Sequence, residues 1–369
     1  MAVPALAETV RIATFNASLT RGGAGLLLAD LERGGSEQVD RVAAILQTVR
    51  PDIVLLNEID HDPEGRALAA FVAHLGVSQR GAEPILYPHV FTAPPNTGVL
   101  TGFDLDGDGD AFGPRDAQGY GRFPGQYGMA LLSRFPFEQD AVVSFVALLW
   151  KDLPGAIPPD HPKYRPSVQR LSSKGHWDVP VVLPGGARVH LLASHPTPPV
   201  FDGPEDFNGR RNHDEMRLWE LYLDGFELPA DGGGTRSAGD APVILLGDLN
   251  ADPEDGDGRR EAIRRLLAHP RLQDPMPMSV GGAAAAEAQA GANIQHRGDP
   301  ARDTADWNDA RGPGNLRVDY VLPDARLEVV GAGVFWPAPG EAGHDLLGEG
   351  RGAASDHRLV WVDVRLPSR

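Results

Sequence analysis

The stretch Val243-Ile244-Leu245-Leu246-Gly247-Asp248-Leu249-Asn250 decides how this chain is interpreted. The four apolar residues at its start predict a buried strand, which the glycine ends. Asp248 and Asn250 follow at the mouth of the strand and point the same way. A carboxylate there can orient or deprotonate a water molecule, and a carboxamide can donate hydrogen bonds to an oxyanion. Taken alone, the stretch fits a polar turn after a strand equally well.

The same pattern recurs at four other places in the chain. Apolar runs over residues 10–15, 52–56 and 188–193 lead to Asn16, to Asn57-Glu58 and to Ser194-His195. Near the C-terminus, the run 318–322 precedes Ser355-Asp356-His357, which opens a strand over 359–364. Polar residues where buried strands stop are typical of active sites on layered α/β or β-sandwich frameworks.

Helices are predicted between these strands. The apolar spacing places them over residues 36–49, 64–75, 214–224 and 259–268. A further buried strand is expected over 129–133, and 179–183 should pair with 189–193 as a hairpin. A glycine-rich loop is expected after the first strand. Segment 81–128 is too long for a plain connector, so we expect a functional excursion there, and segment 280–315 is expected to be a surface loop.

The polar motifs, taken in order, resemble those of the endonuclease/exonuclease/phosphatase superfamily. Its members include pancreatic-type deoxyribonuclease, exonuclease III-like repair nucleases, neutral sphingomyelinases and inositol-polyphosphate 5-phosphatases. The matching pieces are Thr14-Phe15-Asn16, Asn57-Glu58, Ser194-His195, Gly247-Asp248-Leu249-Asn250, Arg317-Val318-Asp319-Tyr320 and Ser355-Asp356-His357. The resemblance implies an α/β fold, a four-layer α/β sandwich with two packed mixed β-sheets flanked by helices. Because the motifs reach both ends of the chain, we expect one catalytic domain over residues 9–369.

The resemblance also implies roles for these residues in phosphoester hydrolysis. It assigns metal binding to Asn16, Glu58 and Asp356, and the two carboxylates are hard oxygen ligands suited to Mg²⁺ or Mn²⁺. Asp248 would position or deprotonate the attacking water, and Asn250 would hold a phosphoryl oxygen.

Two histidines complete the expected catalytic set. His357 would pair with Asp319, whose carboxylate fixes the tautomer and raises the basicity of the imidazole. The protonated ring could then stabilise the pentacovalent phosphoryl group. His195 matches the second imidazole of the deoxyribonuclease-like and sphingomyelinase-like branches. A lone histidine after a strand is more often structural, but its place in this order of motifs favours catalysis.

Candidates for a substrate phosphate contact lie in two segments. Lys174 or His176 precedes a strand at a place where members of the family often carry a cationic contact. Arg211 lies at the start of a predicted helix, where its guanidinium could clamp a phosphate. A solvated helix cap explains Arg211 equally well.

Calcium is expected in the loop Asp104-Leu105-Asp106-Gly107-Asp108-Gly109-Asp110. A carboxylate at every second residue, with glycine near the sixth place of an EF-hand loop, converges oxygens on Ca²⁺. Asp104, Asp106 and Asp108 would be ligands of a structural ion, although Arg115 at the twelfth position excludes a complete EF-hand. The alternative is a disordered acidic tip. Segment 252–257 is a weaker candidate that also fits the acidic start of the next helix.

Composition narrows the function classes. The chain has 34 Lys and Arg against 51 Asp and Glu, a formal net charge of −17. The electric field of this negative charge repels a polymer of phosphates unless metal ions or a basic patch cancel it. The absence of cysteine excludes disulfides, a thiol nucleophile and zinc–thiolate sites. No apolar run approaches the roughly 20 residues that a transmembrane helix needs.

The first eight residues carry a processing signal. Ala5-Leu6-Ala7 fits the small-x-small rule for signal-peptidase cleavage, so residues 1–8 are expected to be the remnant of a removed signal. A secreted or periplasmic location follows. An ordinary alanine-rich start is the alternative.

These observations predict a divalent-metal-dependent phosphoesterase that hydrolyses a phosphodiester or a small organic phosphate by in-line attack of water. A nuclease on DNA or RNA, a sphingomyelinase or phospholipase C-type enzyme, and an inactive calcium-binding recognition module are the alternatives. The expected partner is the phosphate-ester substrate, with nucleic acid as one option. The sequence indicates no obligate protein partner.

Overall fold

The computed structural model describes residues 9–366, and two β-sheets form its centre. The six-stranded sheet has the order β14 (Glu328–Val334), β15 (Val360–Arg365), β1 (Thr9–Leu19), β2 (Ile53–Ile59), β4 (Met129–Ser133) and β3 (His89–Phe91). The five-stranded sheet has the order β13 (Asp319–Pro323), β10 (Val243–Asp248), β7 (Arg188–Ser194), β6 (His176–Val182) and β5 (Val143–Ser144). Both sheets are mixed, because β1 and β10 each have one parallel and one antiparallel neighbour.

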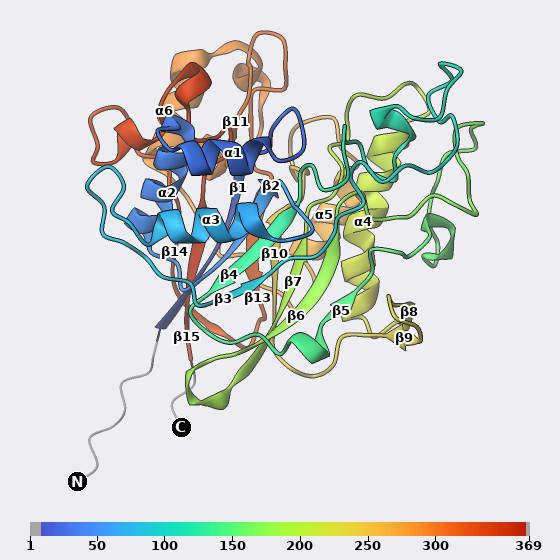
Figure 1. Cartoon of the computed structure of the whole chain (residues 1–369), viewed down its shortest axis with the longest axis horizontal. Helices are drawn as coiled ribbons and strands as arrows, with labels where there is room; N and C mark the ends of the chain where they lie inside the picture. Colours follow the sequence, from blue (N-terminus) through green and yellow to red (C-terminus); the bar gives the residue numbers. More distant parts are fainter. Residues whose placement is uncertain (1–8, 367–369) are drawn as a thin grey trace.

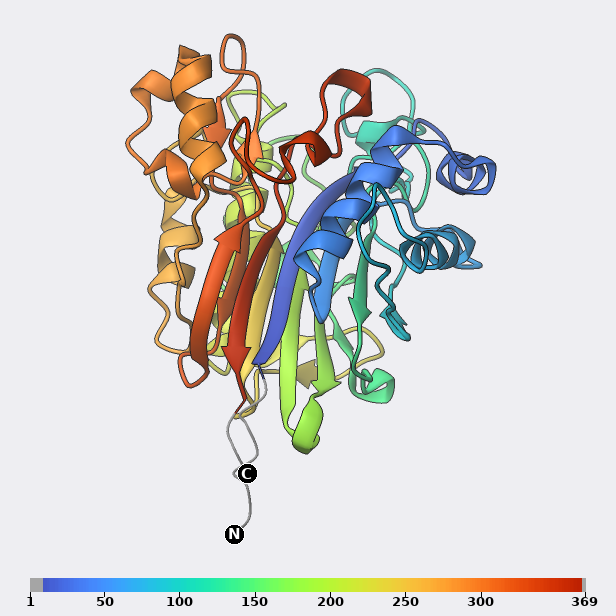
Figure 2. The ribbon, with the colours of Figure 1, turned by 90° about the vertical axis from the view of Figure 1, so that its left-hand side faces the viewer.

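Helices cover the outer faces of the sheets (Figure 1). The helices on the outer faces are α1 (Leu26–Arg33), α2 (Glu37–Val49), α3 (Arg66–Leu75), α4 (Phe207–Leu223) and α5 (Arg260–Leu267). The sixth helix, α6 (Val280–Gln289), packs instead against Trp336 and Pro300. Two small ribbons pair β8 (Leu228–Pro229) with β9 (Thr235–Arg236), and β11 (Ala305–Asp306) with β12 (Asn315–Leu316). Figure 2 shows the sheets packed face to face, with the blue helices of the N-terminal part on one outer side.

Three hydrophobic clusters fill the spaces between these four layers. One joins the six-stranded sheet to α2 and α3, a second lies between the sheets, and a third joins the five-stranded sheet to α4 and α5. The period of two along each strand assigns the residues. In β1, Ile12 faces the other sheet, while Ala13 and Phe15 face the helices. The predicted four-layer α/β sandwich is confirmed.

Most of the predicted helices and strands are present, although the boundaries of some differ from those predicted. The helix predicted over 36–49 is α2, with Ser36 as its N-cap. The helix predicted over 214–224 begins earlier, at Phe207, because polar residues of its first two turns are buried against neighbouring loops. The predicted processing segment 1–8 lies outside the described residues.

One expectation about loops is wrong, because segment 280–315 contains α6 and β11 and reaches the first residue of β12. The glycine-rich loop expected after the first strand is present over residues 20–25, and it leads into α1, a helix that was not predicted. In α6, the small side chains of Gly281 and Gly282 allow close packing, since a Cβ at Gly281 would lie 2.2 Å from the carbonyl oxygen of Trp336. Strand β14 was not expected either. Among residues 9–366, no helix has the length and apolarity needed to cross a bilayer.

Candidate active site

The polar residues of the site come from strand faces that look into the space between the sheets. In β10, Ile244 and Leu246 pack between the sheets, and the period of two gives Asp248 the same direction. Asp319 in β13 is the register partner of Asp248. The glycine before Asp248 is required, because a Cβ at Gly247 would lie 1.9 Å from the carbonyl oxygen of Ser194.

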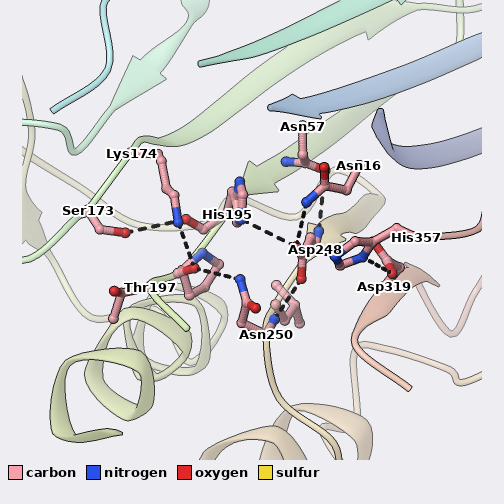
Figure 3. Close-up of polar contacts among 12 residues, drawn as sticks. Asn16, Asn57, Ser173, Lys174, His195, Thr197, Asp248, Asn250, Asp319 and His357 are labelled. Carbon is pink, nitrogen blue, oxygen red and sulfur yellow. Dashed lines mark hydrogen bonds and ion pairs between the residues drawn. The ribbon is translucent and has the colours of Figure 1, made fainter. Parts of the chain in front are cut away.

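Asp248 lies at the centre of a buried hydrogen-bond network (Figure 3). Asn16 Nδ2 donates to its Oδ2 over 3.0 Å, and the backbone N–H of Asn250 donates to its Oδ1 over 2.9 Å. Burial alone would raise the pKa of this carboxyl, but His357 and His195 outweigh burial and lower it. Asp248 is therefore an oriented, ionised acceptor.

His357 and Asp319 form the predicted pair. His357 Nδ1 lies 2.9 Å from Asp319 Oδ2, and its Nε2 lies 3.7 Å from Asp248 Oδ2. Burial lowers the pKa of His357, but the charges of Asp319 and Asp248 raise it to about 10 overall. The ring is thus an imidazolium at neutral pH, with Nε2 on the side of Asp248.

His195 differs from His357 in its charge. Its Nε2 lies 3.3 Å from Asp248 Oδ2, while its Nδ1 is buried and has no hydrogen-bond partner among residues 9–366. Burial and the charge of Lys174 lower the pKa of His195 to about 4. This imidazole is neutral at pH 7, so it can donate one hydrogen bond to Asp248 but does not act as an imidazolium acid.

These groups open onto a cleft of about 1490 Å³. Predicted site residues that line it are Glu58, Lys174, His195, Arg211, Asp248, Asn250, Asp356 and His357, with Asp106 from the calcium loop. Asn16, Asp319 and His176 are not part of the lining. Segment 81–128 contributes Leu105, Arg115 and Tyr120 to one wall, so the predicted excursion borders the cleft.

Glu58 and Asp356, the carboxylates predicted to bind metal, lie in the same cleft but differ in environment. Glu58 has a positive φ of 59° and no side-chain hydrogen bond within the described chain. Burial raises its pKa to about 6, against the lowering charges of His357 and Lys174. Asp356 is exposed and accepts a hydrogen bond from Trp307 Nε1 over 3.1 Å. An unpartnered hard carboxylate in the same cleft as a second one fits a divalent cation.

A second group could also hold a cation. Ligand atoms of Asp248, Asp319 and His357 lie within 4.8 Å of one another. Because the imidazolium already neutralises the two carboxylates, the donor chemistry of Glu58 and Asp356 fits a metal ion better than this group does.

Among the substrate-contact candidates, the geometry favours Lys174. Lys174 Nζ is buried at the cleft and donates to the Pro196 carbonyl over 3.3 Å. Both ring nitrogens of His176 are bonded, to Ser172 Oγ and to the Glu215 carbonyl, and burial lowers its pKa to about 3.

Arg211 borders the cleft, but most of its guanidinium already has partners. Its Nε donates to the Leu171 carbonyl over 2.8 Å, and its Nη2 contacts the carbonyls of Gln118, Arg170 and Ser172. The side chain therefore ties α4 to two loops. Its predicted substrate contact stays a prediction.

Sequence reasoning assigned no role to two residues of the site, Asn57, which it noted as part of a motif, and Trp307, which it did not note. Asn57 Oδ1 accepts hydrogen bonds from the Asp248 backbone N–H, over 3.4 Å, and from Thr14 Oγ1. Its direction follows from the parity of β2, where Leu55 also faces the other sheet. Trp307 contacts both Asp356 and the ring of His357, at 5.4 Å between centroids. It lies in the segment expected to be a surface loop, so no local signal marked it.

The sandwich and its buried Asp–His cluster define the class of layered phosphoesterases. The sequence model of the endonuclease/exonuclease/phosphatase family matches residues 13–357. This chain belongs to the endonuclease/exonuclease/phosphatase family. Members of this family are typically metal-dependent phosphoesterases.

The solved structures that match this chain are distant from it in sequence. An endonuclease/exonuclease/phosphatase protein from Beutenbergia cavernae DSM 12333 is 20% identical with a TM-score of 0.54, covering 97% of this chain and 72% of that one. A family protein from Leptotrichia buccalis C-1013-b is 14% identical with a TM-score of 0.50, covering 97% and 99%. The human Nocturnin catalytic domain is 16% identical with a TM-score of 0.49, covering 99% and 97%. A search of curated proteins found no match.

Proposed function

We propose that this protein is a divalent-metal-dependent phosphoesterase that acts on phosphate esters of small organic groups by in-line attack of water. The supporting observation is the position of Asp248, which is oriented by Asn16 and Asn250 in the cleft that also holds the His357 imidazolium. A fixed acceptor for water beside a fixed cation for the phosphoryl oxygens is the arrangement that phosphoryl transfer needs.

In the proposed reaction, Asp248 accepts a hydrogen bond from the attacking water and aligns it with the phosphorus atom. The His357 imidazolium and Asn250 stabilise charge on the phosphoryl oxygens, and Asp319 keeps the imidazole protonated. Glu58 and Asp356 would hold Mg²⁺ or Mn²⁺, which supplies charge neutralisation at those oxygens when bound. The neutral imidazole of His195, whose Nε2 lies 3.3 Å from Asp248 Oδ2, helps to hold this carboxylate in place.

The charge of the cleft favours a small substrate over a nucleic acid. Nine carboxylates and five Lys or Arg side chains line the cleft, and the whole chain carries −17. A nucleic acid carries a phosphate on every unit, so this negative charge would repel it along its whole length. A small ester has a single phosphate, which lies at the catalytic cations.

A panel of substrates tests the proposal. Bis(p-nitrophenyl) phosphate, p-nitrophenyl phosphate and plasmid DNA are each assayed with Mg²⁺, Mn²⁺, Ca²⁺ or EDTA. We expect hydrolysis of a small ester that EDTA abolishes and that Asp248→Asn removes. The rate should change little between 50 and 200 mM salt, while a nuclease with several phosphate contacts would lose affinity by orders of magnitude. Plasmid cleavage faster than ester hydrolysis would refute the preference for small substrates.

One observation favours a lipid phosphodiester as a second candidate. Phe201 is 87% exposed at the lining of the cleft, next to Val200. An apolar side chain at a cleft rim can enter a bilayer surface. In an assay with sphingomyelin vesicles, Phe201→Ser would then reduce the rate while leaving hydrolysis of a soluble ester unchanged.

A further inference from the structure

Glu215 is a buried carboxylate of α4 that no step of the proposed reaction uses. Its side chain is 0% exposed and makes no ion pair within residues 9–366. Instead, its Oε1 accepts from the backbone N–H and the Oγ of Ser173 over 2.6 and 2.9 Å, and its Oε2 accepts from the N–H of Thr197 over 2.7 Å. A buried carboxylate is costly unless donors replace its lost hydration, and three donors replace it here.

These bonds join two segments at the point where the sheet stops holding them. Strands β6 and β7 pair antiparallel, and His176 and Ser194 are the register pair nearest the site. Ser173 precedes this pair and Thr197 follows it, so neither belongs to the ladder. Both residues line the cleft. The carboxylate of Glu215 therefore fixes the spacing of the two strand ends that border the site.

The peptide group between Pro196 and Thr197 carries this effect into the site. Its N–H donates to Glu215, and its carbonyl oxygen accepts from Lys174 Nζ over 3.3 Å and from Asn250 Nδ2 over 3.1 Å (Figure 3). Because a peptide group is planar, its N–H cannot turn without its carbonyl. The carboxylate that holds the N–H thus also sets the direction of the acceptor shared by the ammonium and the amide.

Glu215 acts on Lys174 through its charge as well. Burial lowers the pKa of the Lys174 ammonium, and the negative charge of Glu215 is the largest influence that raises it. The charge therefore favours the protonated form of a lysine that lies in a buried position at the cleft.

We propose that Glu215 is a positioning residue, which aligns Lys174 and Asn250 for the substrate phosphate by holding the peptide group between Pro196 and Thr197. Glu215 does not line the cleft, so it acts through these two side chains and touches no substrate. This inference rests on the proposed function, because that function assigns the phosphate to Lys174 and Asn250.

Asp214 provides a matched control from the same turn of α4. It is also fully buried, and its Oδ2 accepts from the Ile157 N–H and from Trp150 Nε1, each over 2.7 Å, while its Oδ1 lies 2.9 Å from His213 Nδ1. None of these partners except the helix itself approaches the strand ends that Glu215 joins. Asp214→Asn and Glu215→Gln each replace one buried carboxylate by an amide, so both should lower the melting temperature.

Binding of inorganic phosphate separates the two variants. Measured by isothermal titration calorimetry, Glu215→Gln should weaken phosphate binding by about tenfold, as expected for the loss of one charge-assisted hydrogen bond. Asp214→Asn should bind phosphate as the wild type does. In a Lys174→Gln background, Glu215→Gln should cost less affinity than it does alone, because one of its two targets is already absent. Equal affinities in Glu215→Gln and Asp214→Asn would overturn the proposal.

Crystal structures of the two variants test the geometry without reference to activity. In Glu215→Gln the Pro196 carbonyl should lose its bond to Lys174 or to Asn250, whereas Asp214→Asn should keep both. Two intact bonds in Glu215→Gln would overturn the proposal, whether or not the wild type hydrolyses an ester. A carbonyl that turns in Glu215→Gln, in a protein whose wild type neither binds phosphate nor hydrolyses esters, would support the positioning and refute the proposed function.

Amide hydrogen exchange of the wild type gives a readout that does not depend on a variant folding. The Thr197 N–H lies at the cleft, yet its bond to Glu215 should protect it from exchange with solvent. Exchange of this N–H at the rate of a free amide would also overturn the proposal.

Discussion

Two groups of ligand atoms in this molecule converge within the same 4.8 Å, yet they are built differently. Asp248, Asp319 and His357 are buried, and they come from two strands of the five-stranded sheet and from the segment just before β15. Asp104, Asp106 and Asp108 lie in one loop and are half-buried or exposed. Proximity of carboxylates is therefore common to both, while burial and a rigid frame belong only to the first.

The hydrogen bonds explain the difference. In the loop, Asp104 accepts from the backbone N–H groups of Gly107 and Gly109, so its oxygens stabilise the turn in which they lie. In the buried group, Asp248 is bonded to side chains of strands far away in sequence. Hydrogen bonds within a loop stabilise the conformation of that loop. Contacts between distant strands lie in a buried site where charge is weakly screened, so they shift the pKa values of the groups that they join.

The largest expected effect is that of replacing the central acceptor. Asp248→Asn should lower kcat by about 10³-fold, because the amide cannot accept the proton or the hydrogen bond in the same way. Far-UV circular dichroism should be unchanged. Asp108→Asn, from the loop group, is the control and should retain full activity. An Asp248→Asn enzyme within tenfold of wild type would end the assignment of the buried group as the catalytic one.

Asp319→Asn should shift the pH dependence as well as lower the rate. Because the folded pKa of His357 is raised to about 10, its ion pair stabilises the fold fully below about pH 6.5 and loses this contribution as pH rises through 10. Without the charge of Asp319 the imidazolium deprotonates at lower pH. We expect kcat/KM to fall by about 10²-fold at pH 8 and its alkaline limb to move toward neutrality.

The control for this pH effect is His190→Gln. His190 is also paired with an aspartate, Asp178, but is remote from the cleft. Its replacement should leave the pH profile of activity in place. An unchanged alkaline limb in Asp319→Asn would show that His357 is not the titrating group.

Kinetic measurements can decide whether Lys174 or His176 contacts the substrate phosphate. Lys174→Gln removes the buried cation at the cleft and should raise KM by about tenfold, the lower end of the range for a charge-assisted hydrogen bond. His176→Gln breaks bonds to Ser172 and Glu215, and should lower the melting temperature while KM stays the same. The reverse pattern would assign the phosphate contact to the histidine.

The parts of the fold that could be predicted are those with local signals. The strands that carry Asn16, Glu58 and Asp248 are apolar runs, and the period of two gives Asn16 and Asp248 their inward direction. Glu58 departs from this period at a positive φ of 59°, which the sequence does not indicate. Helix α6 could not be predicted in this way. Its sequence is nearly all alanine and glycine, so no apolar face repeats every three or four residues, and tertiary packing decides its conformation.

The chemistry of the site was only partly predictable for a similar reason. The pairing of His357 with Asp319 follows from the family motifs, and the geometry places them 2.9 Å apart. The contact between Trp307 and Asp356 and the hydrogen bonds that occupy the Arg211 guanidinium depend on segments distant in sequence. A sequence indicates which groups can bond, but their partners emerge only when the layers pack.

The smallest expected effect concerns the calcium predicted for the Asp104 loop. If these carboxylates bind Ca²⁺, the ion must compete with the loop's own N–H groups, so binding should be weak and should raise the melting temperature by only about 1–3 °C. Addition of EGTA should reverse the shift, and Asp104→Asn should abolish it. If neither calcium nor EGTA changes the melting temperature, the loop is an acidic turn held by its own backbone N–H groups, and of the two groups only the buried one has a functional role.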